Sequence, residues 1–92
     1  MNVLDKTGIL ELLRELLHEK YDIPLAALVA EARQSDLALD SMLLLDVMLD
    51  VEELPAFKQR RFQFRDMSLP ANPSLSEIVD LIAANLPAGE RT

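Results

Sequence analysis

Apolar residues recur with helical spacing near the start of the chain. Counting from Ile9, positions i, i+3, i+4, i+7 and i+8 are all large and aliphatic, as in one buried helix face: Ile9, Leu12, Leu13, Leu16 and Leu17. Either Asp5 or Thr7 can cap this helix, because both side chains accept hydrogen bonds from free backbone amides. Pro24 limits its end, since the residue before a proline avoids helical geometry. The pattern predicts a first helix over residues 5–20, followed by a long connection over residues 22–40.

A second helix is predicted over residues 41–54, between the Asp40-Ser41 pair and Pro55, and its two faces differ. One arc is wholly apolar and is expected to face the core: Leu43, Leu44, Val47, Met48, Val51 and Leu54. The opposite arc interleaves large apolar side chains with carboxylates: Met42, Leu45, Asp46, Leu49, Asp50, Glu52 and Glu53. Such an arc either packs on another helix of the same domain or docks a basic partner, with apolar side chains supplying buried area.

The last helix has the clearest start signal in the chain. Ser74-Leu75-Ser76-Glu77 is a capping box, in which the serine hydroxyl and the glutamate carboxylate each accept a hydrogen bond from the other residue's backbone amide. This signal and Pro87 predict a helix over residues 74–86. Prolines limit the preceding segment to a short helix within residues 62–70, and no pair of partner strands is supported. The chain is therefore predicted to be one all-α domain over residues 1–92, a small bundle of three main helices plus a short helix.

Composition narrows the possible chemistry. The chain has 92 residues and a net charge of −7, which disfavours nucleic acid and anionic membrane surfaces as main partners. It has no cysteine and one histidine, His18, so a disulfide scaffold and a thiolate metal site are excluded. The longest apolar run, residues 25–30, is far shorter than a membrane span. Nothing in the first residues resembles a secretion signal, and we expect a cytoplasmic protein.

The charge is unevenly distributed along the chain. Residues 1–55 contain 12 acidic and 4 basic side chains, whereas a basic cluster follows at Lys58, Arg60, Arg61 and Arg65. This cluster is either a solvated loop, or a surface that contacts a particular partner or folds back on the acidic helix.

Ser41, at the start of the second helix, is the candidate for chemistry. Serine and aspartate are both favoured N-caps, so Asp40 and Ser41 have an ordinary structural explanation. A serine hydrolase would need a histidine base and an oxyanion hole, but His18 lies on the first helix and no Gly-x-Ser-x-Gly motif is present. The residues therefore favour a serine that is modified rather than one that attacks a substrate.

The segment around Ser41 resembles the acyl carrier protein family. The resemblance begins with residues 36–42, Asp-Leu-Ala-Leu-Asp-Ser-Met, and continues through Leu45, Asp46, Val47, Met48, Glu52 and Glu53. The family's hallmark is Asp-Ser-Leu at the start of its second helix, followed by an apolar and acidic helix. The predicted helix 74–86 is similar to the family's last helix. The resemblance covers most of the chain, in the same order and at nearly the family's length.

The resemblance implies an acyl-carrier-like helical bundle that is not an enzyme. Ser41 would carry 4′-phosphopantetheine, whose thiol holds acyl groups as thioesters, and Asp40 matches the family's acid beside the attachment serine. Met42, Asp46, Leu49 and Glu53 match positions that the family uses to meet its partner enzymes; Leu45 and Asp50 share the same arc. The implied partners are a phosphopantetheinyl transferase and acyl-transfer, ketosynthase or ligase enzymes with basic docking patches. The bundle interior would shelter the acyl chain, and a monomer is expected.

The chain departs from the family pattern in four places. Ala38 and Leu39 stand where a glycine is usual, and Leu43 stands where many members have an acid. Leu54-Pro55 interrupts the usual glutamate-rich helix end, and the link to the last helix is longer and carries the basic cluster. These departures indicate a specialised carrier in a fatty acid, polyketide or other secondary-metabolite pathway.

Two other functions remain open at the level of sequence. A peptidyl or aminoacyl carrier is the nearest alternative, although such carriers tend to show Gly-Gly-[His/Asp]-Ser where this chain has Ala38-Leu39-Asp40-Ser41. The other is a small helical interaction module without a prosthetic group, in which Ser41 is only a cap and Met42, Leu45 and Leu49 bind a partner helix. The acyl cargo is not encoded in any recognisable motif.

Overall fold

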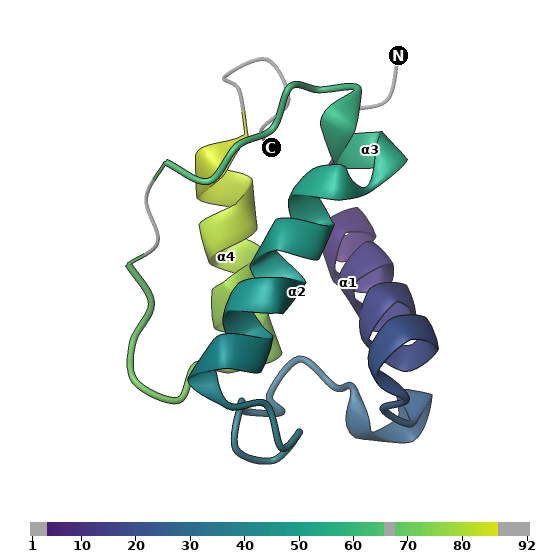
Figure 1. Ribbon diagram of the computed structural model, residues 1–92, viewed down its shortest axis with the longest axis vertical. Helices are drawn as coiled ribbons and strands as arrows, with labels where there is room; N and C mark the ends of the chain where they lie inside the picture. The colour runs from purple at the N-terminus through teal and green to yellow at the C-terminus, as the bar shows by residue number, and fades with distance from the viewer. Residues whose placement is uncertain (1–3, 66–67, 87–92) are drawn as a thin grey trace.

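The computed structural model describes residues 4–65 and 68–86 (Figure 1). Within these ranges the helices are α1 (Lys6–Tyr21), the 3₁₀ turn η1 (Leu25–Ala27), α2 (Ser41–Glu53), α3 (Pro55–Lys58) and α4 (Leu75–Asn85). No strand occurs in the described part of the chain, which confirms the predicted all-α fold. The bounds of α1, α2 and α4 lie within one residue of those expected from the hydrophobic pattern.

The first and last helices, α1 and α4, each begin at a residue whose side chain caps the helix, as the sequence predicts. At α1, Asp5 is the cap, and its Oδ1 accepts a hydrogen bond from the Gly8 amide at 2.8 Å. At α4, the capping box is complete: Ser74 Oγ accepts from the Glu77 amide at 3.2 Å, and Glu77 Oε1 accepts from the Ser74 amide at 2.9 Å. These bonds satisfy amides that have no partner inside the helix.

The predicted short helix within residues 62–70 is wrong in position. The short helix is α3, which begins directly at Pro55, while residues 62–65 and 68–70 are not helical; Asp66 and Met67 lie outside the described residues. Proline is well suited to the first helical position, because its missing amide would have no partner there and its φ is already helical. Pro55 therefore both ends α2, by holding Leu54 extended at ψ 136°, and starts α3.

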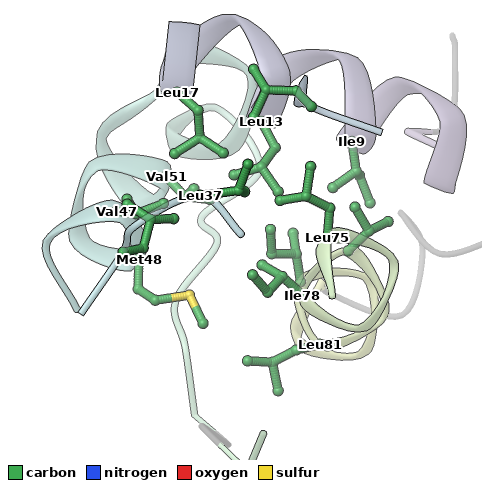
Figure 2. Packing of buried hydrophobic residues seen from close by; sticks show 14 of the residues in the cluster. Ile9, Leu13, Leu17, Leu37, Val47, Met48, Val51, Leu75, Ile78 and Leu81 are labelled. Carbon is green, nitrogen blue, oxygen red and sulfur yellow. The ribbon is translucent and has the colours of Figure 1, made fainter. Parts of the chain in front are cut away.

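The core lies between α1, α2 and α4 (Figure 2). Figure 2 shows side chains of the three helices converging, with Leu37 of the α1–α2 connection among them. The fully buried side chains of the three helices, each at most 2% exposed, are Ile9, Leu13, Leu17, Val47, Met48, Val51, Leu75, Ile78 and Ile82. Because each helix contributes an apolar stripe, none of them can bury its stripe without the others.

A short ladder of backbone hydrogen bonds joins two segments that are far apart in sequence. Three bonds of 2.9 Å connect residues 30–34, before α2, to residues 73–76, at the start of α4. Their donor and acceptor pairs are Gln34 and Pro73, Leu75 and Ala32, and Ser76 and Ala30. We call this the connecting ladder. It holds the long connection against the start of α4, at the bottom of the view in Figure 1.

Ala38, three residues before Ser41, has a left-handed backbone with φ 55°. This conformation favours glycine, because a Cβ crowds the following carbonyl oxygen.

We expect Ala38→Gly to raise the free energy of unfolding by up to about 1 kcal/mol, since relief of this strain exceeds the added entropy of the unfolded glycine. Urea denaturation measures the change. Ala84→Gly, on the exposed side of α4, is the matched control and is expected to lower stability by about 0.5–1 kcal/mol. Equal losses in the two variants would contradict the strain at Ala38.

Candidate functional site

Asp40, and not Ser41, caps α2. The Asp40 backbone is extended, and its Oδ1 accepts a hydrogen bond from the Leu43 amide at 2.8 Å. Ser41 is the first residue of the helix and is exposed to solvent. Within the described part of the chain its hydroxyl makes no hydrogen bond. Helix capping therefore explains Asp40, whereas the Ser41 hydroxyl has no hydrogen-bond partner in the described residues.

The approach to Ser41 is a well-fixed loop. Leu37 and Leu39 are buried, at 7% and 5% exposure, so the chain is anchored on both sides of Ala38. The Gln34 carbonyl accepts hydrogen bonds from the amides of Leu37, at 3.2 Å, and Leu39, at 3.1 Å. Ser41 is thus presented from a rigid base, which is the arrangement that a modifying enzyme needs in order to reach one hydroxyl.

A cavity of about 430 Å³ lies beside Ser41. Leu44, Leu45 and Met48 of α2 form one side, and residues 69–73 form the other; Gln34 and Ser41 complete the lining. Leu69 packs against the hydrophobic core, so the second wall is attached to the bundle. The cavity is mostly apolar with a few polar groups, which is the usual character of a small-molecule site.

The outward arc of α2 is a solvent-exposed surface. The exposed fractions of Met42, Leu45 and Leu49 are 78%, 51% and 53%. Asp46 and Glu53 lie exposed on the same arc. In the described residues, no other helix covers these three apolar side chains, so the arc does not pack inside the domain. Its mixture of apolar area and carboxylates is suited to a partner with basic side chains.

Asp50 differs from the other residues predicted on this arc. Its side chain is 22% exposed and is held by two contacts of 2.6 Å, from Lys20 Nζ to Oδ1 and from the Tyr21 hydroxyl to Oδ2. Glu53 also has an intramolecular partner, Lys58 Nζ at 3.2 Å, but both side chains are 69% exposed and such a pair contributes little. Asp50 therefore joins α2 to the end of α1, whereas Glu53 stays accessible.

The contacts around Asp50 shift two pKa values. Burial alone would raise the pKa of Asp50, but hydrogen bonds from Lys20 and Tyr21 and the charge of Lys20 outweigh it, so the pKa lies below its ordinary range. Burial, the hydrogen bond to Asp50 and the charges of Asp50 and Asp46 raise the pKa of Tyr21 well above its ordinary value. Both shifts favour an ionised Asp50 carboxylate that accepts a hydrogen bond from a neutral Tyr21 phenol.

The histidine base that a serine hydrolase needs does not lie at Ser41 in the described residues. His18 is exposed at the end of α1, where its Nδ1 lies 2.9 Å from the Ile23 carbonyl, and it does not line the cavity. Among the described residues, no cluster of three or more potential ligands could hold a metal ion. No helix in the described ranges is both long enough and apolar enough to cross a membrane.

The residues that line the cavity from outside α2 were not predicted as site residues: Gln34 and residues 69–73. Asn72 also has a left-handed backbone, with φ 50°, and its Oδ1 accepts a hydrogen bond from the Ser35 amide at 2.8 Å. The one available signal was the Asn72-Pro73 turn pair, which predicts a turn but not what lies opposite it. The connecting ladder and the hydrogen bonds from Arg33 and Ser35 to Asn72 hold this turn near the start of α2.

The cap at Asp40 predicts the outcome of two substitutions. Asp40→Ala is expected to lower the free energy of unfolding by about 1 kcal/mol, because the Leu43 amide loses its acceptor. Asp40→Asn keeps a side-chain oxygen and is expected to stay near the wild-type value. Chemical denaturation of both variants measures the difference, and equal losses would show that the charge of Asp40, rather than its hydrogen bond, stabilises α2.

The contacts of Asp50 predict a pH-dependent stability. Asp50→Asn is expected to lower the free energy of unfolding by about 1 to 2 kcal/mol at pH 7, where the carboxylate is charged. A carboxyl whose pKa is depressed by folding stabilises above its unfolded pKa and loses that contribution as pH falls through the folded pKa. The difference in the free energy of unfolding between wild type and Asp50→Asn should therefore become smaller as pH falls below about 4. Tyr21→Phe, which keeps the Lys20 contact, is the control with a smaller loss. A gap that is constant with pH would contradict the assignment.

Comparison with known protein families, with curated proteins and with solved structures finds no match for this chain. Three features of the molecule itself indicate where it functions: a hydroxyl at Ser41 without a hydrogen bond in the described residues, the cavity beside it, and the exposed arc of α2. All three features adjoin α2, and together they define the candidate site.

Proposed function

We propose that the protein is a discrete acyl carrier protein, modified with 4′-phosphopantetheine at Ser41. The observation that carries the proposal is that Asp40 caps α2, while the exposed Ser41 hydroxyl makes no hydrogen bond within the described residues. A serine at this position beside an apolar cavity is suited to hold a flexible arm. When bound, the group supplies a thiol that forms thioesters, which a chain without cysteine cannot do itself.

The residues around Ser41 fit a phosphodiester-linked group. Ser41 opens a helix of 13 residues, and the amide end of a helix favours a negatively charged phosphate. The apolar side chains Leu44, Leu45 and Met48 face the adjoining cavity and are suited to an acyl chain, while Gln34 and Asn72 offer polar atoms to the arm. In the attachment reaction, Ser41 Oγ bonds to the β-phosphorus of coenzyme A and adenosine 3′,5′-bisphosphate leaves. The transferase must take the serine proton, since no histidine lines this site.

The exposed arc of α2 supports docking of several enzymes in turn. Met42, Leu45 and Leu49 supply apolar area close to Ser41, and Asp46 and Glu53 supply negative charge. Partners with basic patches would be steered to this arc. The proposed partners are a phosphopantetheinyl transferase and the acyl-transfer, ketosynthase or ligase enzymes of a specialised fatty acid or polyketide pathway. A peptidyl or aminoacyl carrier is the alternative within the same chemistry.

The proposal predicts a single modification at one serine. Incubation with coenzyme A and a broad-specificity phosphopantetheinyl transferase should add the mass of one phosphopantetheine, measured on the intact protein. Ser41→Ala should gain nothing. Ser35→Ala is the matched control, because Ser35 is also exposed and its bond to Asn72 uses only its backbone amide; it should be modified like wild type.

Two outcomes would contradict the proposal. One is a folded wild-type protein that takes up no group from any transferase tested. The other is a Ser41→Ala protein that retains full activity in its cell, which would favour the interaction module built on Met42, Leu45 and Leu49. After modification, loading by an acyltransferase rather than by an amino-acid-activating ligase separates the acyl from the aminoacyl carrier.

A further inference from the structure

We propose that the basic segment, residues 58–65, is a docking surface for an acidic segment of a partner protein. This segment lies across the end of the bundle at α3, above α2 and α4 in Figure 1. It carries Lys58, Arg60, Arg61 and Arg65 and no acidic residue. The proposal does not depend on modification of Ser41.

The basic segment is anchored to the core through aromatic side chains. Phe57 and Phe62 are 1% and 3% exposed, and Phe64 packs against the core from a half-buried position. The ring centroids of Phe57 and Phe62 are 5.0 Å apart, and those of Phe62 and Phe64 are 4.7 Å apart in an edge-to-face arrangement. Such pairs add to the energy of burial and fix the ring positions. The segment is therefore a built part of the fold and not a solvated linker.

Hydrogen bonds fix the backbone of the same segment. Glu52 Oε2 accepts a hydrogen bond from the Phe64 amide at 3.0 Å, and Asn85 Oδ1 accepts from the Arg65 amide at 2.8 Å. Arg60 Nη1 donates to the Ala56 carbonyl at 2.7 Å, so this guanidinium stabilises the end of α3. The bonds to Glu52 and Asn85 connect the segment to α2 and α4.

The outward side of the segment forms a polar row. Phe62 and Phe64 point to the core, whereas Arg61, Gln63 and Arg65 are exposed. The three exposed side chains are not spaced as in a regular strand, because Arg61 has a left-handed backbone, with φ 55°, and Arg65 lies in a bend. They share the solvent side of one short segment, so a partner segment with several acidic side chains can meet Arg61 and Arg65 together.

The arginines of this row have no carboxylate partner among the described residues. Lys58 pairs with Glu53 and Glu52 accepts from Phe64, but no ion pair forms at Arg61 or Arg65 in these ranges. A hollow of about 430 Å³ adjoins Arg61, between Lys58 and Gln63 on one side and Glu52 and Glu53 on the other. Arginine binds carboxylates through two parallel hydrogen bonds, so Arg61 and Arg65 are equipped for aspartate or glutamate.

The charge of the rest of the molecule favours a short acidic protein segment, rather than a larger polyanion, as the ligand of the basic segment. A net charge of −7 repels nucleic acid and anionic bilayers at long range. A short acidic peptide would bind at this end of the bundle, where Lys58 already pairs with Glu53 of the α2 arc, and would stay clear of Asp46 nearer to Ser41. The 13 residues of α2 separate the segment from Ser41 by about 20 Å at 1.5 Å per residue. A partner bound here would leave Ser41 and the exposed arc open.

The test is binding of a short fluorescent peptide of alternating glutamate and serine, followed by anisotropy at low ionic strength. Arg61→Gln combined with Arg65→Gln should weaken binding by about tenfold, since each exposed arginine contributes one solvent-screened ion pair. The matched control is Lys6→Gln combined with Arg33→Gln. This control also removes two positive charges, but from exposed side chains that already pair with Asp80 and Glu77. It should change the affinity for the peptide by less than about twofold.

Three results would overturn the proposal. The first is no binding of the peptide to the wild-type protein. The second is equal weakening in the two double variants, which would mean that only net charge matters. The third is tighter binding of phosphatidylglycerol vesicles or single-stranded DNA through Arg61 and Arg65 than of the peptide. Ser41→Ala should bind the peptide like wild type, so failure of the carrier proposal and failure of this one are separable.

Discussion

The connecting ladder determines where α2 and α4 begin relative to each other. Its three backbone hydrogen bonds join the connection before α2 to the residues before and at the start of α4. Without them, two long non-helical segments would both have to be ordered by side-chain contacts alone, at a large cost in conformational entropy. The ladder instead gives both helices fixed starting points. Both walls of the cavity and the rigid approach to Ser41 follow from that one constraint.

The distribution of charge divides the surface into regions with different roles. The outward arc of α2 keeps Asp46 and Glu53 exposed, whereas Asp50 is turned to Lys20 and Tyr21 at the end of α1. Carboxylates on one helix therefore have different roles, because their neighbours differ. The basic segment lies at the far end of the same helix, where Lys58 pairs with Glu53. Asp46 lies nearer to Ser41 and has no basic partner among the described residues, so that part of the arc stays acidic.

The helices and their caps could be predicted from sequence because they depend on local spacing. The stripe from Ile9 to Leu17 and the capping box at Ser74 are complete within a few residues. The position of α3, the contacts of Asp50 and the lining residues Gln34 and Asn72 could not be predicted. Tyr21 and Asp50 are 29 residues apart, and the cavity forms only where the ladder closes. Helical periodicity tells which face is apolar but not which distant residue meets it.

The second wall of the cavity, residues 69–73, has a mechanical consequence. It contains two prolines and no helical hydrogen bonds, and it is tied down beyond Asn72 by the connecting ladder. Its contact with α2 is a contact between side chains, chiefly at Leu69. Asn72 is also held by hydrogen bonds from Arg33 and Ser35, so the wall is fixed at both of its ends, at Leu69 and at Asn72. A ligand beside Ser41 therefore meets a hollow that already exists, and binding does not have to order a loop.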